Sequence, residues 1–194
     1  MNKNVERGQA TRAHLIDVAT RLFAERGYDG TSIEAVLAES GVSRGSLYHH
    51  FPGEDALFWA VLEGVAVRVG GQLAAATRDI QDPVAALRAE CLAWIRLASD
   101  PVFQQTVLID APAVLGWERW RELDEQANLG WIRTALEYAA GAGYFERRHV
   151  DVFAHIVLAA VNEAALMIAR ADDPAAALPV GERAIAEFLD RLLR

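Results

Sequence analysis

Residues 31–51 read TSIEAVLAESGVSRGSLYHHF, and this stretch decides the fold. It begins with the spacing of a capping box, in which Thr31 accepts a bond from the amide of Glu34 and Glu34 returns one to the amide of Thr31. We expect the helix that follows to end near Ser40, because Gly41 accepts the left-handed backbone that stops a helix.

A second short helix is predicted to begin at Ser43, which is an N-cap candidate, and to end at His50. Two short helices joined by a turn form a helix-turn-helix. The apolar side chains of this unit would pack on the preceding helix, whose apolar stripe runs from Leu15 to Phe23. The inward-facing residues are Ile33, Val36, Leu37, Val42, Leu47 and Phe51.

The outer side of the second helix is small and polar, which suits a helix whose N-terminal half enters the major groove of DNA. Arg44 is the only residue there able to make the bidentate contact to guanine, and its alternative is a surface salt bridge. Thr31 and Ser32 lie at a helix N-terminus, where backbone amides can hold a phosphate. Tyr48 could instead be a packing residue, and His50 could satisfy a backbone group. The predicted DNA contacts are Thr31, Ser32, Ser43, Arg44, Gly45, Ser46, Tyr48, His49 and His50.

The composition of the whole chain is that of a helical globular protein. Its 194 residues are 53% hydrophobic and include 14 Gly and 6 Pro, a balance that favours helix over sheet. The formal net charge of −8 argues against general adhesion to nucleic acid, so any DNA binding would come from a local surface. The single cysteine, Cys91, excludes an internal disulfide framework and fits a reducing cytosol.

The chain beyond residue 55 is predicted to form longer helices. Asp-Pro pairs mark helix starts at Pro83, Pro101 and Pro174, because Asp caps a helix and Pro is tolerated at its first position. Further helices are expected over residues 117–140 and 152–169. The second of these is apolar on nearly all sides, so two different surfaces must cover it.

Four of the five tryptophans fall between residues 94 and 131, which suggests an apolar cavity with aromatic walls. A place in the core is the alternative for each aromatic residue. Asn162 and Glu163 interrupt an apolar helix and would orient a ligand, or else pair across a dimer seam and fix its register. A glutamate at this depth also argues against a membrane span. The predicted ligand contacts are Trp94, Phe103, Asp110, Trp117, Trp120, Trp131, Asn162 and Glu163.

Enzyme classes are excluded by the parts that the sequence lacks. It contains no Gly-x-Ser-x-Gly turn, phosphate loop, dinucleotide fingerprint or Cys/His dyad. His14, His149 and His155 are scattered without the spacing of metal ligands, so we predict structural roles for them. Neither a metal nor a cofactor is expected.

The sequence resembles the TetR family of bacterial transcriptional regulators. The resemblance covers residues 10–60 strongly and a subgroup pattern at residues 110–117. It implies an N-terminal DNA-binding domain, a larger helical domain that senses a small molecule, and a homodimer closed by the last two helices. The motifs that carry it are Thr11–Phe23, Ala24-Glu25-Arg26-Gly27-Tyr28, Thr31-Ser32-Ile33, Gly41–Phe51, Leu57-Phe58 and Asp110–Trp117.

One position departs from the family pattern. Members often carry a lysine that binds phosphate near the start of the fourth helix, where this chain has Glu54 beside Asp55. Residues 1–60 contain six Lys and Arg against eight Asp and Glu, so no broad basic face is present. Lys3, Arg7 and Arg12 in the N-terminal segment could compensate by reaching phosphates.

These observations predict an all-α protein with a helix-turn-helix DNA-binding domain at residues 1–55 and a helical ligand-binding and dimerisation domain at residues 56–194. The expected function is that of a cytoplasmic repressor, a homodimer that a small molecule releases from a palindromic operator in double-stranded DNA. An activator is a second possibility. A helical ligand-binding protein with weak or lost operator binding is a third, suggested by Glu54. No association with a membrane is expected.

Overall fold

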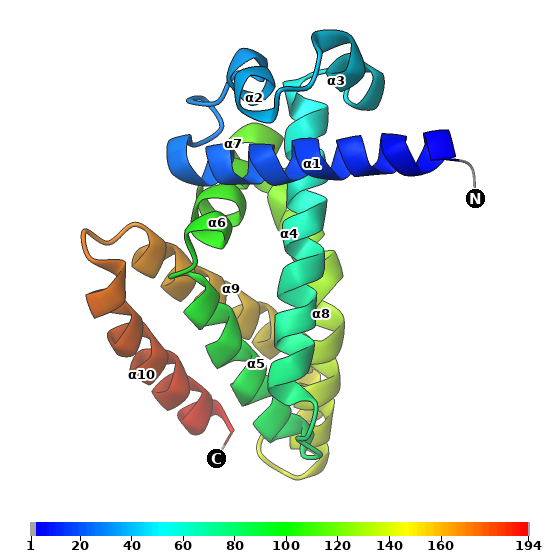
Figure 1. Ribbon diagram of the computed structural model, residues 1–194. Helices are drawn as coiled ribbons and strands as arrows, with labels where there is room; N and C mark the ends of the chain where they lie inside the picture. Colours follow the sequence, from blue (N-terminus) through cyan, green and yellow to red (C-terminus); the bar gives the residue numbers. More distant parts are fainter. Residues whose placement is uncertain (1–2, 194) are drawn as a thin grey trace.

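The all-α class predicted from the composition is confirmed. The computed structural model describes residues 3–193, and within that range the regular structure is entirely helical (Figure 1). Three N-terminal helices lie at one end of the molecule, and α4 runs from them along the remaining helices.

The N-terminal unit consists of α1 (Lys3–Arg26), α2 (Ile33–Ser40) and α3 (Arg44–His50). The inward-facing residues expected from the sequence pattern lie against α1, with Leu47 and Leu15 fully buried. Helices of eight and seven residues are marginal alone, so packing of α2 and α3 on α1 supplies stabilisation that they lack by themselves.

The cap of α2 differs from the predicted capping box by one residue. Ser32 is the N-cap, and its hydroxyl accepts a bond from the amide of Ala35 at 3.2 Å. The Thr31 side chain is 2% exposed and donates instead to the carbonyls of Gly27 and Leu22, at 2.8 and 3.2 Å. Thr31 therefore ties the turn back to α1, and this tertiary contact outweighs the local capping pattern.

All three Asp-Pro predictions are confirmed. α5 (Pro83–Leu97), α6 (Pro101–Phe103) and α10 (Pro174–Leu192) begin at the expected prolines, and the preceding aspartate accepts a backbone amide bond in each case. α5 lies in contact with α4 (Glu54–Thr77), α8 (Trp117–Gly141), α9 (Val150–Ala169) and α10. It is the helix around which the larger unit is assembled.

A π-helical segment that the sequence did not predict follows α6. This segment, η1 (Gln104–Asp110), continues into α7 (Ala111–Leu115). Gly116 then takes a φ of 81°, a left-handed value that lets the chain turn into α8. Wide helical turns of this kind occur frequently at functional sites, because they re-aim side chains relative to an α-helix.

α9, preceded by the short turn η2 (Arg147–His149), is covered on one side only. One side packs against α5, α8 and α10, while Val152, Ile156 and Met167 are 59%, 42% and 67% exposed. By length and composition, α4 and residues 147–169 could cross a membrane, but core helices pass the same test, and both contribute buried residues to this bundle.

Candidate DNA-reading helix and central cavity

The outer face of α3 is polar and accessible, as predicted. Leu47 is completely buried and anchors the helix, while Arg44, Gly45, Tyr48 and His49 are exposed. The N-cap Ser43 is also exposed, and Ser46 and His50 are half-buried at the edge of this face. The helix therefore presents a narrow polar surface that a DNA groove can approach.

Arg44 forms the surface salt bridge that the sequence analysis held as its alternative. Its guanidinium lies 2.7 Å from a carboxylate oxygen of Glu34 on α2, and both side chains are largely exposed. This hydrogen bond lowers the pKa of Glu34 below its ordinary value. Because water screens such a pair, Arg44 can exchange Glu34 for another acceptor at small cost.

The two residues predicted to contact phosphate at the start of α2 differ in their exposure to solvent. Ser32 is exposed at the start of α2, where it remains available, but buried Thr31 has its hydroxyl committed to two carbonyls. The Thr31 side chain is therefore not available to DNA in this structure, while the phosphate contact predicted for this helix N-terminus through its backbone amides stays a prediction. The Thr31 hydroxyl is committed because the reversal of the chain at Gly27 brings the Gly27 carbonyl to it.

The start of α4 carries negative charge next to this unit. Tyr28 donates a hydrogen bond from its hydroxyl to Asp55, and partial burial followed by the charge of Asp55 raises the pKa of Glu54. A carboxylate pair here would repel a DNA phosphate, whereas a lysine at the same position would attract one.

A central cavity of about 660 Å³ opens between α4, α5, α7, α8 and the α6–η1 segment. Its walls include five aromatic side chains, of which the sequence predicted four. Phe103 packs edge-on against Trp94, with ring centroids 5.1 Å apart. The aromatic residues at the cavity are Trp59, Trp94, Phe103, Trp120 and Trp131.

Four of the predicted ligand contacts do not line this cavity, namely Asp110, Trp117, Glu163 and Asn162, the last of which lines a smaller adjoining pocket. Trp117 is 57% exposed and packs on the outer side of Trp120. Glu163 is exposed on the uncovered side of α9, and Asp110 faces α1. Each was assigned from its neighbours in sequence, whereas the direction of its side chain depends on where its helix packs.

The structure adds three acidic residues to the cavity wall that the sequence analysis missed, namely Glu63, Glu90 and Asp124. All three stand four residues from a tryptophan of the same wall, in the pairs Trp59–Glu63, Glu90–Trp94 and Trp120–Asp124. Since residues four apart share a helix face, this spacing was the signal that could have found them.

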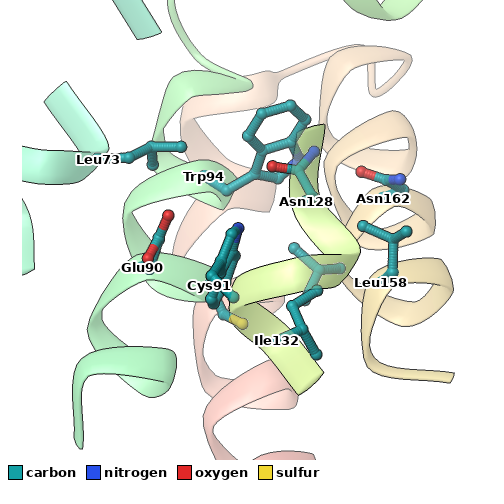
Figure 2. A pocket seen from close by; sticks show the side chains of 10 residues that line it. Leu73, Glu90, Cys91, Trp94, Asn128, Ile132, Leu158 and Asn162 are labelled. Atoms are coloured by element: carbon teal, nitrogen blue, oxygen red, sulfur yellow. The ribbon is translucent and has the colours of Figure 1, made fainter. Parts of the chain in front are cut away.

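Asn162 points toward the cavity region and away from the exposed side of α9. It is 4% exposed and lines a small pocket of about 20 Å³ that shares Leu73, Glu90, Trp94 and Trp131 with the central cavity (Figure 2). Of the two interpretations of Asn162, the structure therefore favours the pocket over the dimer seam.

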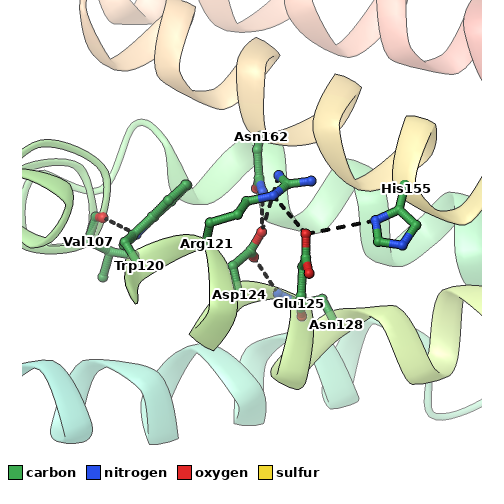
Figure 3. A network of polar contacts seen from close by, with 8 residues as sticks. All are labelled: Val107, Trp120, Arg121, Asp124, Glu125, Asn128, His155 and Asn162. Atoms are coloured by element: carbon green, nitrogen blue, oxygen red, sulfur yellow. Dashed lines mark hydrogen bonds and ion pairs between the residues drawn. The ribbon is translucent and has the colours of Figure 1, made fainter. Parts of the chain in front are cut away.

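A polar network holds the wall formed by α8 and α9 (Figure 3). Asp124 accepts bonds from the side-chain amides of Asn128 and Asn162, at 2.8 and 2.5 Å. Burial raises the pKa of Asp124, and these two hydrogen bonds oppose that shift. Trp120 donates from its indole to the carbonyl of Val107 at 3.1 Å, which joins the same wall to η1.

Asp110 connects η1 with the N-terminal unit. Its carboxylate accepts the amide of Tyr28 and the side-chain amide of Gln105, both at 2.9 Å, and burial raises its pKa. The approach is close at Gly27, where an added Cβ would lie 3.1 Å from Gln105 and where φ is 70°. The left-handed φ therefore favours glycine there, and any larger residue would also require the Gln105 side chain to shift.

Two family profiles match the chain. Residues 15–61 match "Bacterial regulatory proteins, tetR family", and residues 84–192 match "Tetracyclin repressor-like, C-terminal domain". No group of three or more potential metal ligands occurs within the described residues.

Similar proteins include characterised regulators and solved structures. The HTH-type transcriptional regulator AcrR of Shigella flexneri is 34% identical over 44% of this chain, which spans 40% of that regulator. The HTH-type transcriptional regulator LmrA of Bacillus subtilis is 28% identical over 71% of the chain and 76% of its own length. A TetR-family regulator structure from Pectobacterium atrosepticum superposes with a TM-score of 0.79 at 28% identity, covering 100% of this chain and 98% of that one.

The second profile alone spans more than half of the chain, and the first covers the helix-turn-helix whose geometry is described above. The chain therefore belongs to the TetR family of bacterial regulatory proteins.

Proposed function

We propose that the protein is a transcriptional repressor that binds a palindromic operator as a homodimer and leaves it when a small molecule occupies the central cavity. The exposed polar face of α3, anchored by buried Leu47, is the observation that carries this proposal. Each subunit would place α3 in a major groove, with half-sites one helical turn, about 34 Å, apart. Such a protein acts in the cytoplasm, where the DNA is.

The uncovered side of α9 supports the homodimer. Val152, Ile156 and Met167 recur on that side, and Val180 on α10 is 59% exposed. A second copy packing its own α9 and α10 there would bury these side chains and form a four-helix seam, which is the second cover that the apolar helix requires. Glu163 would then lie at the seam.

Two structural connections support ligand response. Val107 and Ala111 on the η1–α7 segment line the cavity, and Asp110 between them holds the backbone of Tyr28. α4 supplies another wall of the cavity and begins at Asp55, which Tyr28 also contacts. A ligand that fits only one arrangement of these walls would shift the N-terminal unit, provided that it binds that state more tightly. We accordingly divide the chain into a DNA-binding domain at residues 1–55 and a sensing and dimerisation domain at residues 56–194.

A mobility-shift assay with the DNA flanking the protein's own gene tests operator binding. We expect a shift at low salt that survives competition by random duplex. The acidic start of α4 favours a second candidate, a ligand-binding protein without operator function. Absence of any shift at low salt, where phosphate contacts are strongest, would support that candidate instead.

Repression itself needs a transcription assay. A promoter containing the bound site should yield less transcript when the protein is added, because the bound dimer competes with RNA polymerase. An increase in transcript would identify an activator and would overturn the repressor assignment.

A further inference from the structure

The side chains that line the central cavity carry a net negative charge. Glu63, Glu90 and Asp124 contribute carboxylates to its wall, and no lysine, arginine or histidine is among the described residues that line it. The apolar wall weakens the solvation of Glu90, which is half-buried, and of Asp124, which is buried, so the field of these two carboxylates is stronger than it would be on the surface. Glu63 is exposed and adds its charge at the solvent side of the cavity.

Two of the three carboxylates lack a compensating cation. Within residues 3–193, Glu90 takes part in no ion pair or side-chain hydrogen bond, and burial raises its pKa. Among the described residues, the only side-chain partner of the Glu63 carboxylate is the indole N–H of Trp59, at 3.0 Å. Asp124 differs, because two amides and Arg121, at 3.9 Å, partly offset its charge.

The aromatic side chains of the wall also favour a positively charged ligand. Trp59 and Trp94 stand on the same helix faces as Glu63 and Glu90, so each free carboxylate lies beside an indole. An indole face attracts a cation through its quadrupole, more strongly where water is excluded. A cavity lined by indoles and carboxylates therefore selects for a positive charge carried on an apolar body.

An orphaned acceptor adds an independent indication. Asn162 is 96% buried, and its Oδ1 has no hydrogen-bond partner, since its amide nitrogen is committed to Asp124. Asp124 accepts hydrogen bonds, so the amide cannot be turned around without placing two acceptors together. In Figure 2 the oxygen of Asn162 points into the small pocket toward Trp94 and Asn128. This pocket adjoins the central cavity at Glu90 and Trp94, so an N–H donor that a ligand of the cavity extends into the pocket would satisfy this oxygen.

We infer that the ligand of the central cavity is a flat, apolar organic cation with N–H donors, such as a protonated aromatic amine, rather than a neutral or anionic molecule. Glu90 supplies the main charge contact, Trp94 stacks on the ring system, and the volume of about 660 Å³ accommodates a tricyclic compound. This inference rests on the ligand response proposed above, and it adds the chemical class.

Three probes of one shape test the inference on the full chain without DNA. They are 9-aminoacridine, a cation at neutral pH, neutral acridine, and anionic acridine-9-carboxylate. In isothermal titration calorimetry we expect 9-aminoacridine to bind about tenfold or more tighter than acridine, and the anion to bind most weakly. Equal affinity for the cation and the neutral probe, tighter binding of the anion, or no binding of any probe would overturn the inference.

The variant Glu90→Gln tests whether Glu90 is the source of the preference for a cation. The variant should lose about tenfold in affinity for 9-aminoacridine while its affinity for acridine stays unchanged. The matched control is Glu118→Gln, which removes an exposed carboxylate of α8 outside the cavity and should bind both probes like the native protein. A loss for 9-aminoacridine of the same size in both variants would show a long-range charge effect and would overturn the assignment of Glu90.

A mobility-shift assay on the same preparations separates this inference from the proposed function. A native protein that binds operator DNA without preferring the cation leaves the repressor proposal standing and removes the ligand class. The reverse result, with cation preference but no DNA binding, removes the repressor proposal and supports the ligand class.

Discussion

Replacing Asp110 tests the contact between η1 and the N-terminal unit. Asp110→Ala removes the acceptor of two hydrogen bonds, from the Tyr28 amide and from Gln105, each 2.9 Å long. A hydrogen bond to a charged group contributes about 1.5–3 kcal/mol, and the burial that raises the pKa of Asp110 offsets part of the sum. We therefore expect a net loss of about 2 kcal/mol in the free energy of unfolding at neutral pH.

Asp110→Asn is the matched control for that substitution. The new side chain keeps one oxygen for the Tyr28 amide, and Gln105 can rotate its own amide to present an oxygen to the new NH₂ group. Both bonds then persist, and the buried charge is gone. We expect most of the native stability to remain in this variant.

Urea unfolding followed by circular dichroism measures both variants, and the midpoint should fall for alanine with an unchanged slope. An alanine variant as stable as the native protein would refute the assigned contact, as would an asparagine variant that is equally destabilised. Asp110→Ala should also retain operator affinity while releasing DNA less completely when ligand binds. Full release would show that the signal passes through α4 alone.

Four further substitutions test the other sites. Arg44→Ala should weaken operator binding about tenfold to hundredfold and relax one base position, whereas equal loss on random duplex would rule out base reading. Leu47→Ala, at a fully buried position, should cost about 2–5 kcal/mol in urea unfolding, and a cost near zero would contradict its anchoring role. Burial raises the folded-state pKa of Glu90, so native stability falls as the pH rises through that pKa. Glu90→Gln should therefore be more stable than the native protein at neutral pH and lose this advantage below the ordinary glutamate pKa. An advantage that persists in acid would contradict the burial effect. Met167→Glu should convert the proposed dimer to monomer in light scattering, and an intact dimer would exclude the α9 side as the seam.

Features set by neighbouring residues could be predicted from the sequence. The three Asp-Pro helix starts and the division of the helix-turn-helix into buried and exposed sides depend on contacts within one or two turns. The sequence placed the cap of α2 one residue too early, because distant groups compete for the hydroxyl of the predicted capping residue. Ser32 rather than Thr31 caps α2, because the Thr31 hydroxyl bonds to the carbonyls of Leu22 and Gly27.

The candidate ligand site was predicted only in part. Large aromatic side chains are buried in most arrangements of the helices. For this reason the sequence was sufficient to place Trp94, Trp120 and Trp131 in the interior, where they line the cavity. Charged residues carry no such bias. Glu90 therefore passed unnoticed, and Asp110 was assigned to a cavity that it does not face.

Periodicity, capping residues and the helix-turn-helix pattern were sufficient for the helical class, the positions of most helices and the outward face of α3, because each depends on interactions a few residues apart. Only tertiary packing decided which carboxylates surround the cavity, that η1 takes a π-helical turn, and that Asp110 reaches Tyr28, 82 residues away. Such contacts depend on how whole helices rotate against one another, and that rotation is set by the summed burial of many side chains rather than by any short segment.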